Sequence, residues 1–259
     1  NALFSGLGIY VFRLGIVGVA LGTVLARLVG VLILWRELDL STIRWSWGLD
    51  GELLRLSLPA AGERLMMRAG DVVIIAIVVV FGTDAVAGNA IGEVLTQFNY
   101  MPAFGVATAT VMLVGHAVGE GDMKEVGLIR QRTFWLSFAC MWPVALGIFA
   151  LGRPLTLLYT DNSGAITASL LVILFSLLGT PMAVGTVIYT AVWQGLGNAR
   201  LPFYATTIGM WLIRIVTGYL LGVTFGLGLP GVWAGTLLDN GFRWLFLKVL
   251  FDRKMREIT

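Results

Sequence analysis

Cysteine, histidine and charged residues are all scarce in this sequence of 259 residues. Because Cys140 is the single cysteine, an internal disulfide is excluded. One cysteine and one histidine are also too few for the ligand set of a structural zinc site. Only 13% of the residues are charged, against about 25% in an average soluble domain. The sequence shows no catalytic constellation and no phosphate-binding glycine loop. We therefore expect neither an enzyme nor a bound metal or cofactor, and a net charge of +3 gives no reason to expect nucleic-acid binding.

Apolar residues dominate the chain instead, with a share of 58% and a mean hydropathy of +0.87. A helix that crosses a bilayer needs about 20 predominantly apolar residues. Seven runs reach this length, so the sequence predicts an all-α membrane protein with seven transmembrane helices. The runs are Leu14–Trp35, Leu56–Val80, Val86–Val118, Thr133–Leu151, Ile166–Trp193, Pro202–Phe225 and Pro230–Phe251.

Basic residues gather at one end of these runs. The stretches 36–55, 119–132 and 252–259 are rich in arginine and lysine, whereas the opposite connections carry only Arg13 and Arg153. Loops with an excess of positive charge face the cytoplasm. We therefore expect an integral protein of the plasma (inner) membrane, surrounded by the lipid bilayer, with a cytoplasmic C-terminus.

An internal repeat links the first and last runs. Residues 14–23 and residues 227–236 share the pattern LGxxGVxxGT. Glycines at such spacing allow a helix to pack closely against its neighbour. The repeat predicts that each run ends one unit of a duplicated protein, and that the two units have the same orientation in the membrane.

Four short motifs follow one another along the chain, each occurring once. They are Leu58–Ala61 (LPAA), Tyr100–Gly105 (YMPAFG), Leu113–Asp122 (LVGHAVGEGD) and Trp193–Arg200 (WQGLGNAR). Together they resemble the multidrug and toxic compound extrusion (MATE) family, and the resemblance covers nearly the whole chain.

The resemblance implies a transporter of twelve helices in two six-helix lobes. Residues 1–36 would then be the last helix of the N-terminal lobe, and residues 37–55 a cytoplasmic linker between the lobes. Residues 56–251 would be the six-helix C-terminal lobe, and residues 252–259 a cytoplasmic tail. The rest of the N-terminal lobe would be a missing part of the same protein.

The resemblance also implies the activity, namely secondary active export of amphipathic or cationic drugs in exchange for H⁺ or Na⁺. In sodium-coupled members a carboxylate lies about four turns before the last motif. The corresponding stretch here, Gly179–Ala183, contains no carboxylate, so that cation site is not carried over.

Several charged residues are predicted to lie deep in the bilayer. A rise of about 1.5 Å per residue places them near the middle of the hydrocarbon core. They are Arg68, Asp71, Glu93, Arg214 and Asp239. Ionisable residues at this depth mark ion or substrate pathways in transporters. We propose Glu93, Glu63 and Asp71 as ion-coupling candidates, while a static ion pair such as Arg68–Asp71 stays an alternative.

Polar residues near these charges are candidates for a substrate cavity. Asn89, Glu93 and Gln97 recur at intervals of four and therefore share one helix face. The substrate-cavity candidates are Asn89, Gln97, Tyr100, Arg68 and Tyr189. Arg214 and Asp239 have matching depths and are predicted to form a structural or coupling ion pair. Arg243 is predicted to reach toward the cytoplasmic interface.

Two other functions stay open at this point. A lipid-linked precursor flippase of the same superfamily would use a cavity lined by arginines such as Arg64, Arg68 and Arg214 to bind a pyrophosphate. A seven-span receptor or retinal protein fits the number of runs. A retinal protein, however, needs a lysine in the middle of its last helix, and Lys248 lies near the end.

Overall fold

The protein is described here by a computed structural model, which covers residues 2–11, 14–37 and 51–258. Its contacts divide the chain into two units, residues 1–49 and residues 50–259. The described residues form helices and turns without a strand, as the sequence predicted. The linker predicted for residues 37–55 lies largely outside the described residues.

The first unit is a short helical hairpin. A first turn, α1 (Ala2–Gly6), continues into a π-helical segment, η1 (Leu7–Val11), and the chain returns as α2 (Gly15–Glu37). The described residues before the first predicted run are thus also helical, and they pack on α2.

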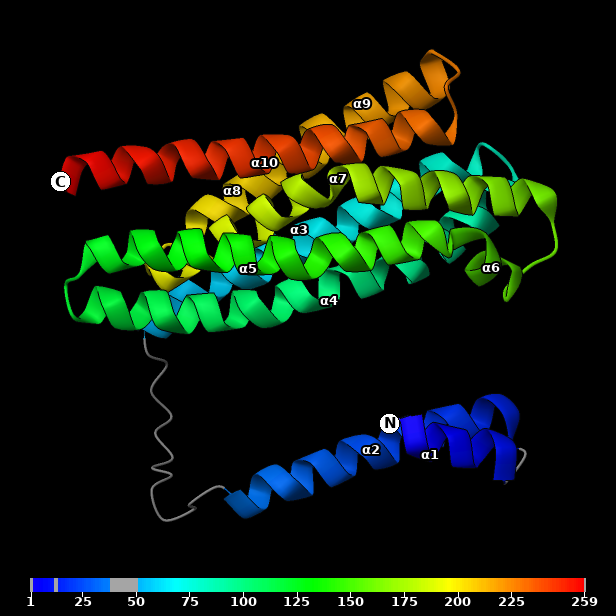
Figure 1. Cartoon of the computed structure of the whole chain (residues 1–259), viewed down its shortest axis with the longest axis horizontal. Helices are drawn as coiled ribbons and strands as arrows, with labels where there is room; N and C mark the ends of the chain where they lie inside the picture. Colours follow the sequence, from blue (N-terminus) through cyan, green and yellow to red (C-terminus); the bar gives the residue numbers. More distant parts are fainter. Residues whose placement is uncertain (1, 12–13, 38–50, 259) are drawn as a thin grey trace. The chain divides into compact units, whose positions relative to one another are not determined.

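The second unit is a bundle of long helices (Figure 1). The segments α8, η3, α9 and η4 follow one another without a break and form one long helix over residues 200–224. The elements are α3 (Gly51–Val79), α4 (Thr83–Gly119), α5 (Met123–Ala150), α6 (Gly152–Leu157), α7 (Ser163–Gly195), α8 (Arg200–Ile208), η3 (Gly209–Ile215), α9 (Val216–Tyr219), η4 (Leu220–Thr224) and α10 (Leu229–Ile258).

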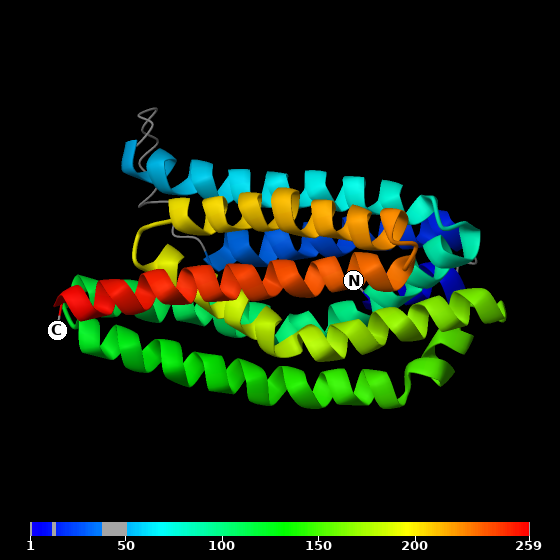
Figure 2. The same cartoon turned by 90° about the horizontal axis from the view of Figure 1, so that it is seen from above.

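The connections of this bundle alternate between its two ends. The turn after α4, the turn before α8 and the C-terminus lie at one end (Figure 2). The turn before α4, the α6 region and the turn before α10 lie at the other. Side-chain oxygens cap two of the helix starts, since Asp122 caps α5 and Asn162 caps α7.

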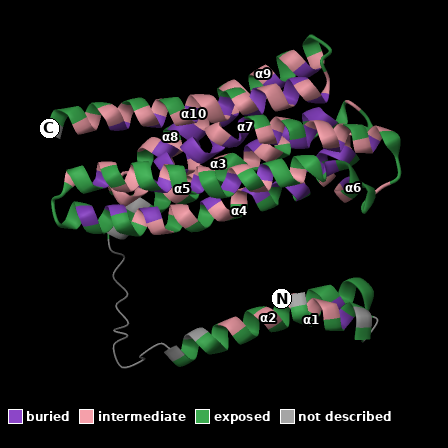
Figure 3. Ribbon diagram, viewed as in Figure 1, coloured by how far each residue is buried: buried purple, intermediate pink, exposed green. Residues whose placement is uncertain are grey.

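Helix α7 occupies the centre of the bundle. It packs against α4, α5 and α10, and α3 runs beside the long helix of residues 200–224. In α7, 56% of the apolar stretch is buried, against 22% in α4 and in α5. Figure 3 shows the same difference as a concentration of buried residues along α7.

Five helical segments are both long and apolar enough to cross a membrane: α2, α4, α5, α7 and residues 200–224. Helices α3 and α10 have 29 and 30 residues, which is sufficient length, but their charged and polar side chains lower their hydropathy. The predicted all-α membrane fold is therefore confirmed, and the count of seven spanning helices stays a prediction.

Two apolar clusters form the core of the bundle. One contains Val114, Trp193 and Phe251, and the other contains Ile74, Val172 and Val232. Between them lies a set of polar side chains that we call the polar layer. It consists of Glu63, Asp71, Asn89, Glu93, Asn99, Thr180, Thr206, Arg214, Asp239, Asn240 and Arg243.

The predicted repeat is visible in the backbone. Gly15 and Gly228 both have positive φ, +54° and +64°, just before or at the start of a long helix. Their separation of 213 residues also relates the two π-helical segments, η1 (Leu7–Val11) and η4 (Leu220–Thr224).

The next glycines of each repeat make the close contacts that the pattern predicted. A Cβ on Gly18 would lie 2.7 Å from the backbone of Gly8, and one on Gly231 would lie 2.5 Å from the backbone nitrogen of Gly222. The same local hairpin is thus built twice along the chain.

Candidate functional site

The buried ion pair of the polar layer joins two residues of α10. Arg243 donates from Nη2 to Asp239 Oδ2 at 2.8 Å, one helical turn away. Asp239 is fully buried and Arg243 is 4% exposed. The placement of Arg243 at the cytoplasmic interface was wrong, because its guanidinium turns inward to neutralise Asp239.

Gly209 makes room for this pair. A Cβ at Gly209 would lie 2.2 Å from Asp239 Oδ1 and 2.9 Å from Arg243 Cγ. The carboxylate therefore rests directly against the backbone where α8 passes into η3. Within the described part of the chain, Asp239 Oδ1 has no hydrogen-bond partner.

Arg214 pairs with a different aspartate from the one predicted. Its Nη1 lies 3.5 Å from Asp71 Oδ1, while Arg68 Nη1 lies 3.5 Å from Asp71 Oδ2 on the other side. The predicted ion pair between Arg214 and Asp239 is therefore replaced by two pairs, Arg214–Asp71 and Asp239–Arg243. Matching depth could not distinguish these partners, because it leaves the direction of each side chain around its helix undetermined.

Glu93 is half-buried and has a neutral partner. Asn89 donates to Glu93 Oε1 at 3.1 Å, and Trp233 of α10 donates to Asn89 Oδ1 at 3.0 Å. This chain of two hydrogen bonds ties α10 to the predicted polar face of α4. The charges of Arg214 and Asp71, which have opposite signs, both act on Glu93.

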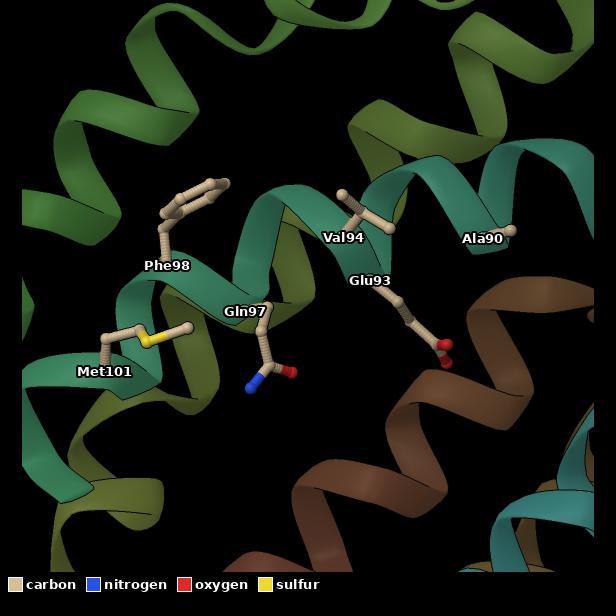
Figure 4. Close-up of a pocket in the computed structure, with 6 residues that line it drawn as sticks. All are labelled: Ala90, Glu93, Val94, Gln97, Phe98 and Met101. Carbon is tan, nitrogen blue, oxygen red and sulfur yellow. The ribbon is translucent and has the colours of Figure 1, made fainter. Parts of the chain in front are cut away.

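Glu93 also lines an open pocket of about 470 Å³ on the face of α4. Its lining residues are Ala90, Glu93, Val94, Gln97, Phe98 and Met101 (Figure 4). Glu93 and Gln97 point to the same side of the helix, whereas Val94 and Phe98 point to the other. The pocket thus combines one carboxylate and one amide with apolar and aromatic surface.

Glu63 has its own set of partners. Thr206 of α8 donates to Glu63 Oε1 at 3.1 Å, and Gln194 of α7 donates to Oε2 at 3.5 Å. The positive charges of Arg243 and Arg64 also act on this carboxylate. Glu63 therefore joins α3, α7 and α8 at a point separate from the pocket of Glu93.

The five predicted substrate-cavity residues do not share one cavity. Gln97 lines the pocket of Glu93, and Asn89 holds the Glu93 carboxylate. Tyr100 is half-buried further along α4. The side chain of Arg68 is 86% exposed and meets Asp71 at the edge of the layer.

Tyr189 lies away from the pocket. Its hydroxyl accepts a hydrogen bond of 3.0 Å from Arg130, its ring packs edge-on against Phe251, and it is 2% exposed. The prediction that Tyr189 lines a substrate cavity is therefore wrong for this structure, because the ring is buried between the Arg130 guanidinium, 5.8 Å from its centroid, and Phe251.

The sequence reasoning missed several buried uncharged residues in and beside the polar layer. Asn99 donates to Thr180 at 3.0 Å, both fully buried, and Thr186 donates to the backbone carbonyl of Asn240 at 2.9 Å. A buried amide in a spanning helix needs a partner, so Asn99 was detectable from its position. Its partner on α7 was not.

The described part of the layer holds four carboxylates and two well-buried guanidinium groups. The carboxylates are Glu63, Asp71, Glu93 and Asp239, and the guanidinium groups are Arg214 and Arg243. Such a layer can accept a proton or attract a cationic group. Among the described residues, no group of three or more histidine, cysteine, aspartate or glutamate side chains has the arrangement to hold a metal ion.

Comparison with known proteins identifies one family model. The model described as MatE matches residues 59–220, which include α4, α5 and α7 entirely and most of the polar layer.

Two curated relatives illustrate the similarity. The chain is 32% identical to the "Probable multidrug resistance protein NorM" of Thermotoga maritima, over 92% of this chain and 53% of that protein. It is 26% identical to the "Uncharacterized transporter YisQ" of Bacillus subtilis, over 90% of this chain and 53% of that protein. The chain thus spans about half the length of the curated relatives it matches.

A solved structure shows the same fold at lower identity. The structure "Crystal structure of MATE in the straight conformation" matches with a TM-score of 0.86 and 19% identity, covering 98% of this chain and 60% of that one.

Proposed function

The chain belongs to the MatE family, and from this membership we propose that it forms part of a secondary active transporter. The transporter exports amphipathic or cationic compounds in exchange for H⁺ or Na⁺. The rest of a two-lobed protein supplies the other side of the transport cleft. The C-terminus faces the cytoplasm, in keeping with the basic residues at that end of the sequence.

The observation that carries this proposal is the position of Glu93. A carboxylate in the apolar part of a spanning helix is costly unless it faces water or a partner, and such residues mark transport pathways. Glu93 lines an open pocket together with Phe98 and Met101, which offer apolar contact to an amphipathic compound. The same residue can therefore meet a coupling ion and a substrate.

Exchange follows from the chemistry of a single carboxylate. The ionised form of Glu93 attracts an organic cation or Na⁺, and the protonated form does not. Substrate and coupling ion therefore compete for one group, and each favours the conformation in which it binds better. Glu63 and Asp71 remain further coupling candidates, since each is half-buried and hydrogen-bonded or ion-paired between helices.

Transport by the complete protein in proteoliposomes tests this proposal. Uptake of a fluorescent organic cation is followed under an imposed pH gradient and, separately, an imposed Na⁺ gradient. We expect Glu93→Gln to lower gradient-driven transport at least about a hundredfold, the lower end of the typical contribution of a proton-transfer group. Glu63→Gln is measured in parallel.

Glu125→Gln is the matched control, because Glu125 is an exposed glutamate in the first turn of α5, away from the pocket. It should transport at the wild-type rate. Full activity in both Glu93→Gln and Glu63→Gln would remove the proposed coupling residues.

The flippase alternative has one observation in its favour. Arg64 and Arg68 lie on neighbouring turns of α3, and both side chains are exposed. Guanidinium groups are the usual partners of phosphate. Flipping of a fluorescent lipid-linked pyrophosphate by the same proteoliposomes, without transport of the organic cation, would favour this alternative over drug export.

A further inference from the structure

Arg214 occupies the junction of the polar layer. It lies on the π-helical segment η3, and its side chain is 11% exposed. One nitrogen, Nη1, reaches Asp71 at 3.5 Å and also lies 3.9 Å from the sulfur of Met210. Its Nε is buried and has no hydrogen-bond partner among the residues that the structure describes. The guanidinium therefore has a donor left for a second acceptor.

Charged groups from three neighbouring elements surround Glu93. Arg214 on η3 and Asp71 on α3 act on it directly. The other charged groups of the polar layer and its edge on these elements are Arg68 on α3 and the pair Asp239 and Arg243 on α10, and Tyr100 is a further titratable residue of α4. The charge of Asp239 is neutralised by Arg243. Arg68, in turn, is largely exposed to solvent. The charges that act most directly on Glu93 are consequently those of Arg214 and Asp71.

Asp71 can release Arg214 without losing every partner. Its second oxygen, Oδ2, already lies 3.5 Å from Arg68. Glu93, by contrast, has only the neutral amide of Asn89 as a hydrogen-bond donor among the described residues. When Glu93 is ionised, its negative charge is less well neutralised than that of Asp71. Coulomb attraction then favours a movement of the Arg214 guanidinium from Asp71 toward Glu93.

We propose that Arg214 is the positioning residue of Glu93, shared between that carboxylate and Asp71. Arg214 rests on Asp71 while Glu93 holds a proton, and turns toward Glu93 when the proton leaves. Proton occupancy of Glu93 is thereby linked to the contact between α3 and η3. The inference rests on the coupling role of Glu93 in the proposed function.

The test compares the pH dependence of transport in single-charge variants of the complete protein. Arg214→Gln removes a positive charge near Glu93, so the protonated form of Glu93 persists to higher pH. The midpoint of the transport activity plotted against pH should therefore move up by about one pH unit. Asp71→Asn removes a negative charge, so Glu93 becomes the one carboxylate of the two that can still attract Arg214. Its midpoint should move down by about one pH unit.

Three further variants separate this role from a merely structural one. Arg214→Lys keeps the charge and should keep the wild-type midpoint. The double variant Arg214→Gln/Asp71→Asn leaves no unpaired member of the ion pair, so it remains measurable if a single variant fails to fold. Its pH midpoint should rise above the wild-type value, because ionised Glu93 has lost the guanidinium that turns toward it, but by less than that of Arg214→Gln, because the opposing charge of Asp71 is gone as well. Arg130→Gln, which loses a guanidinium on α5 bound to Tyr189, should leave the midpoint unchanged.

The outcomes distinguish this inference from the proposed function. Equal midpoints in Arg214→Gln, Asp71→Asn and wild type, or shifts in the same direction, overturn the positioning role of Arg214. If the single variants cannot be purified, a double variant with the same pH midpoint as Arg130→Gln also overturns the positioning role of Arg214. If Glu93→Gln itself transports with the wild-type pH profile, the proposed coupling residue is wrong.

Discussion

Alanine at Gly209 tests how tightly the Asp239–Arg243 pair is held against η3. The added Cβ would lie 2.2 Å from Asp239 Oδ1 and 2.9 Å from Arg243 Cγ. Non-bonded heavy atoms prefer separations of about 3.5 Å or more, so the carboxylate would have to withdraw by about 1 Å. Withdrawal disturbs an ion pair of 2.8 Å that is buried in the bundle.

The bundle has little room to relieve this overlap by moving α10 as a whole. Further along the same interface, a Cβ on Gly235 would lie 2.9 Å from the Arg214 carbonyl oxygen, which shows a second close contact. Overpacking of this kind costs about 1–3 kcal/mol. The intrinsic helix preference of alanine over glycine returns up to about 1 kcal/mol.

The measurement is the apparent melting temperature of the purified complete protein in detergent. A change of 1 kcal/mol corresponds to roughly 2–4 °C in a domain of this size. We expect Gly209→Ala to melt below wild type by several degrees. Gly105→Ala and Gly147→Ala are matched controls, since a Cβ at either position meets nothing within 4 Å. A Gly209→Ala protein that melts with these controls would refute the close approach of α10 to η3.

Two more substitutions test individual contacts by the same melting assay. Asn162→Ala removes the cap of α7, whose side-chain oxygen accepts from Gly164 N at 2.8 Å, and should cost about 1 kcal/mol; unchanged melting would show that the cap is dispensable. Asp239→Asn leaves Arg243 charged and buried without its counter-ion and should cost about 3–5 kcal/mol. The double variant Asp239→Leu/Arg243→Met should recover most of that loss, and an equally unstable double variant would contradict the ion-pair explanation.

The sequence predicted the long helices well because their apolar runs are continuous. The run predicted as Thr133–Leu151 lies within α5 except for its last residue, which caps the helix, and Ile166–Trp193 lies within α7. The short helix α6 was missed, because six residues carry too little periodicity to indicate a helix. The glycine repeat succeeded because backbone contact leaves a requirement that only glycine meets.

The candidate site was predictable in depth but not in pairing. Helix rise placed Asp71, Arg214 and Asp239 at one depth, which stays a prediction. In the structure the charges of Asp71 and Arg214 do act on Asp239. The partners depend on the rotation of each helix and on the reach of long side chains. For this reason the residue one turn from Asp239, Arg243, displaced the more distant Arg214 as its partner.

Bare backbone contact at Gly222 and Gly231 determines how the last hairpin can move. Ordinary helix pairs slide by exchanging rotamers of the side chains between them, but at these glycines there is no such cushion to rearrange. We therefore expect the two helices of this hairpin to tilt together as one rigid unit. A movement of the helix that carries Arg214 should then shift Trp233 on the other helix as well.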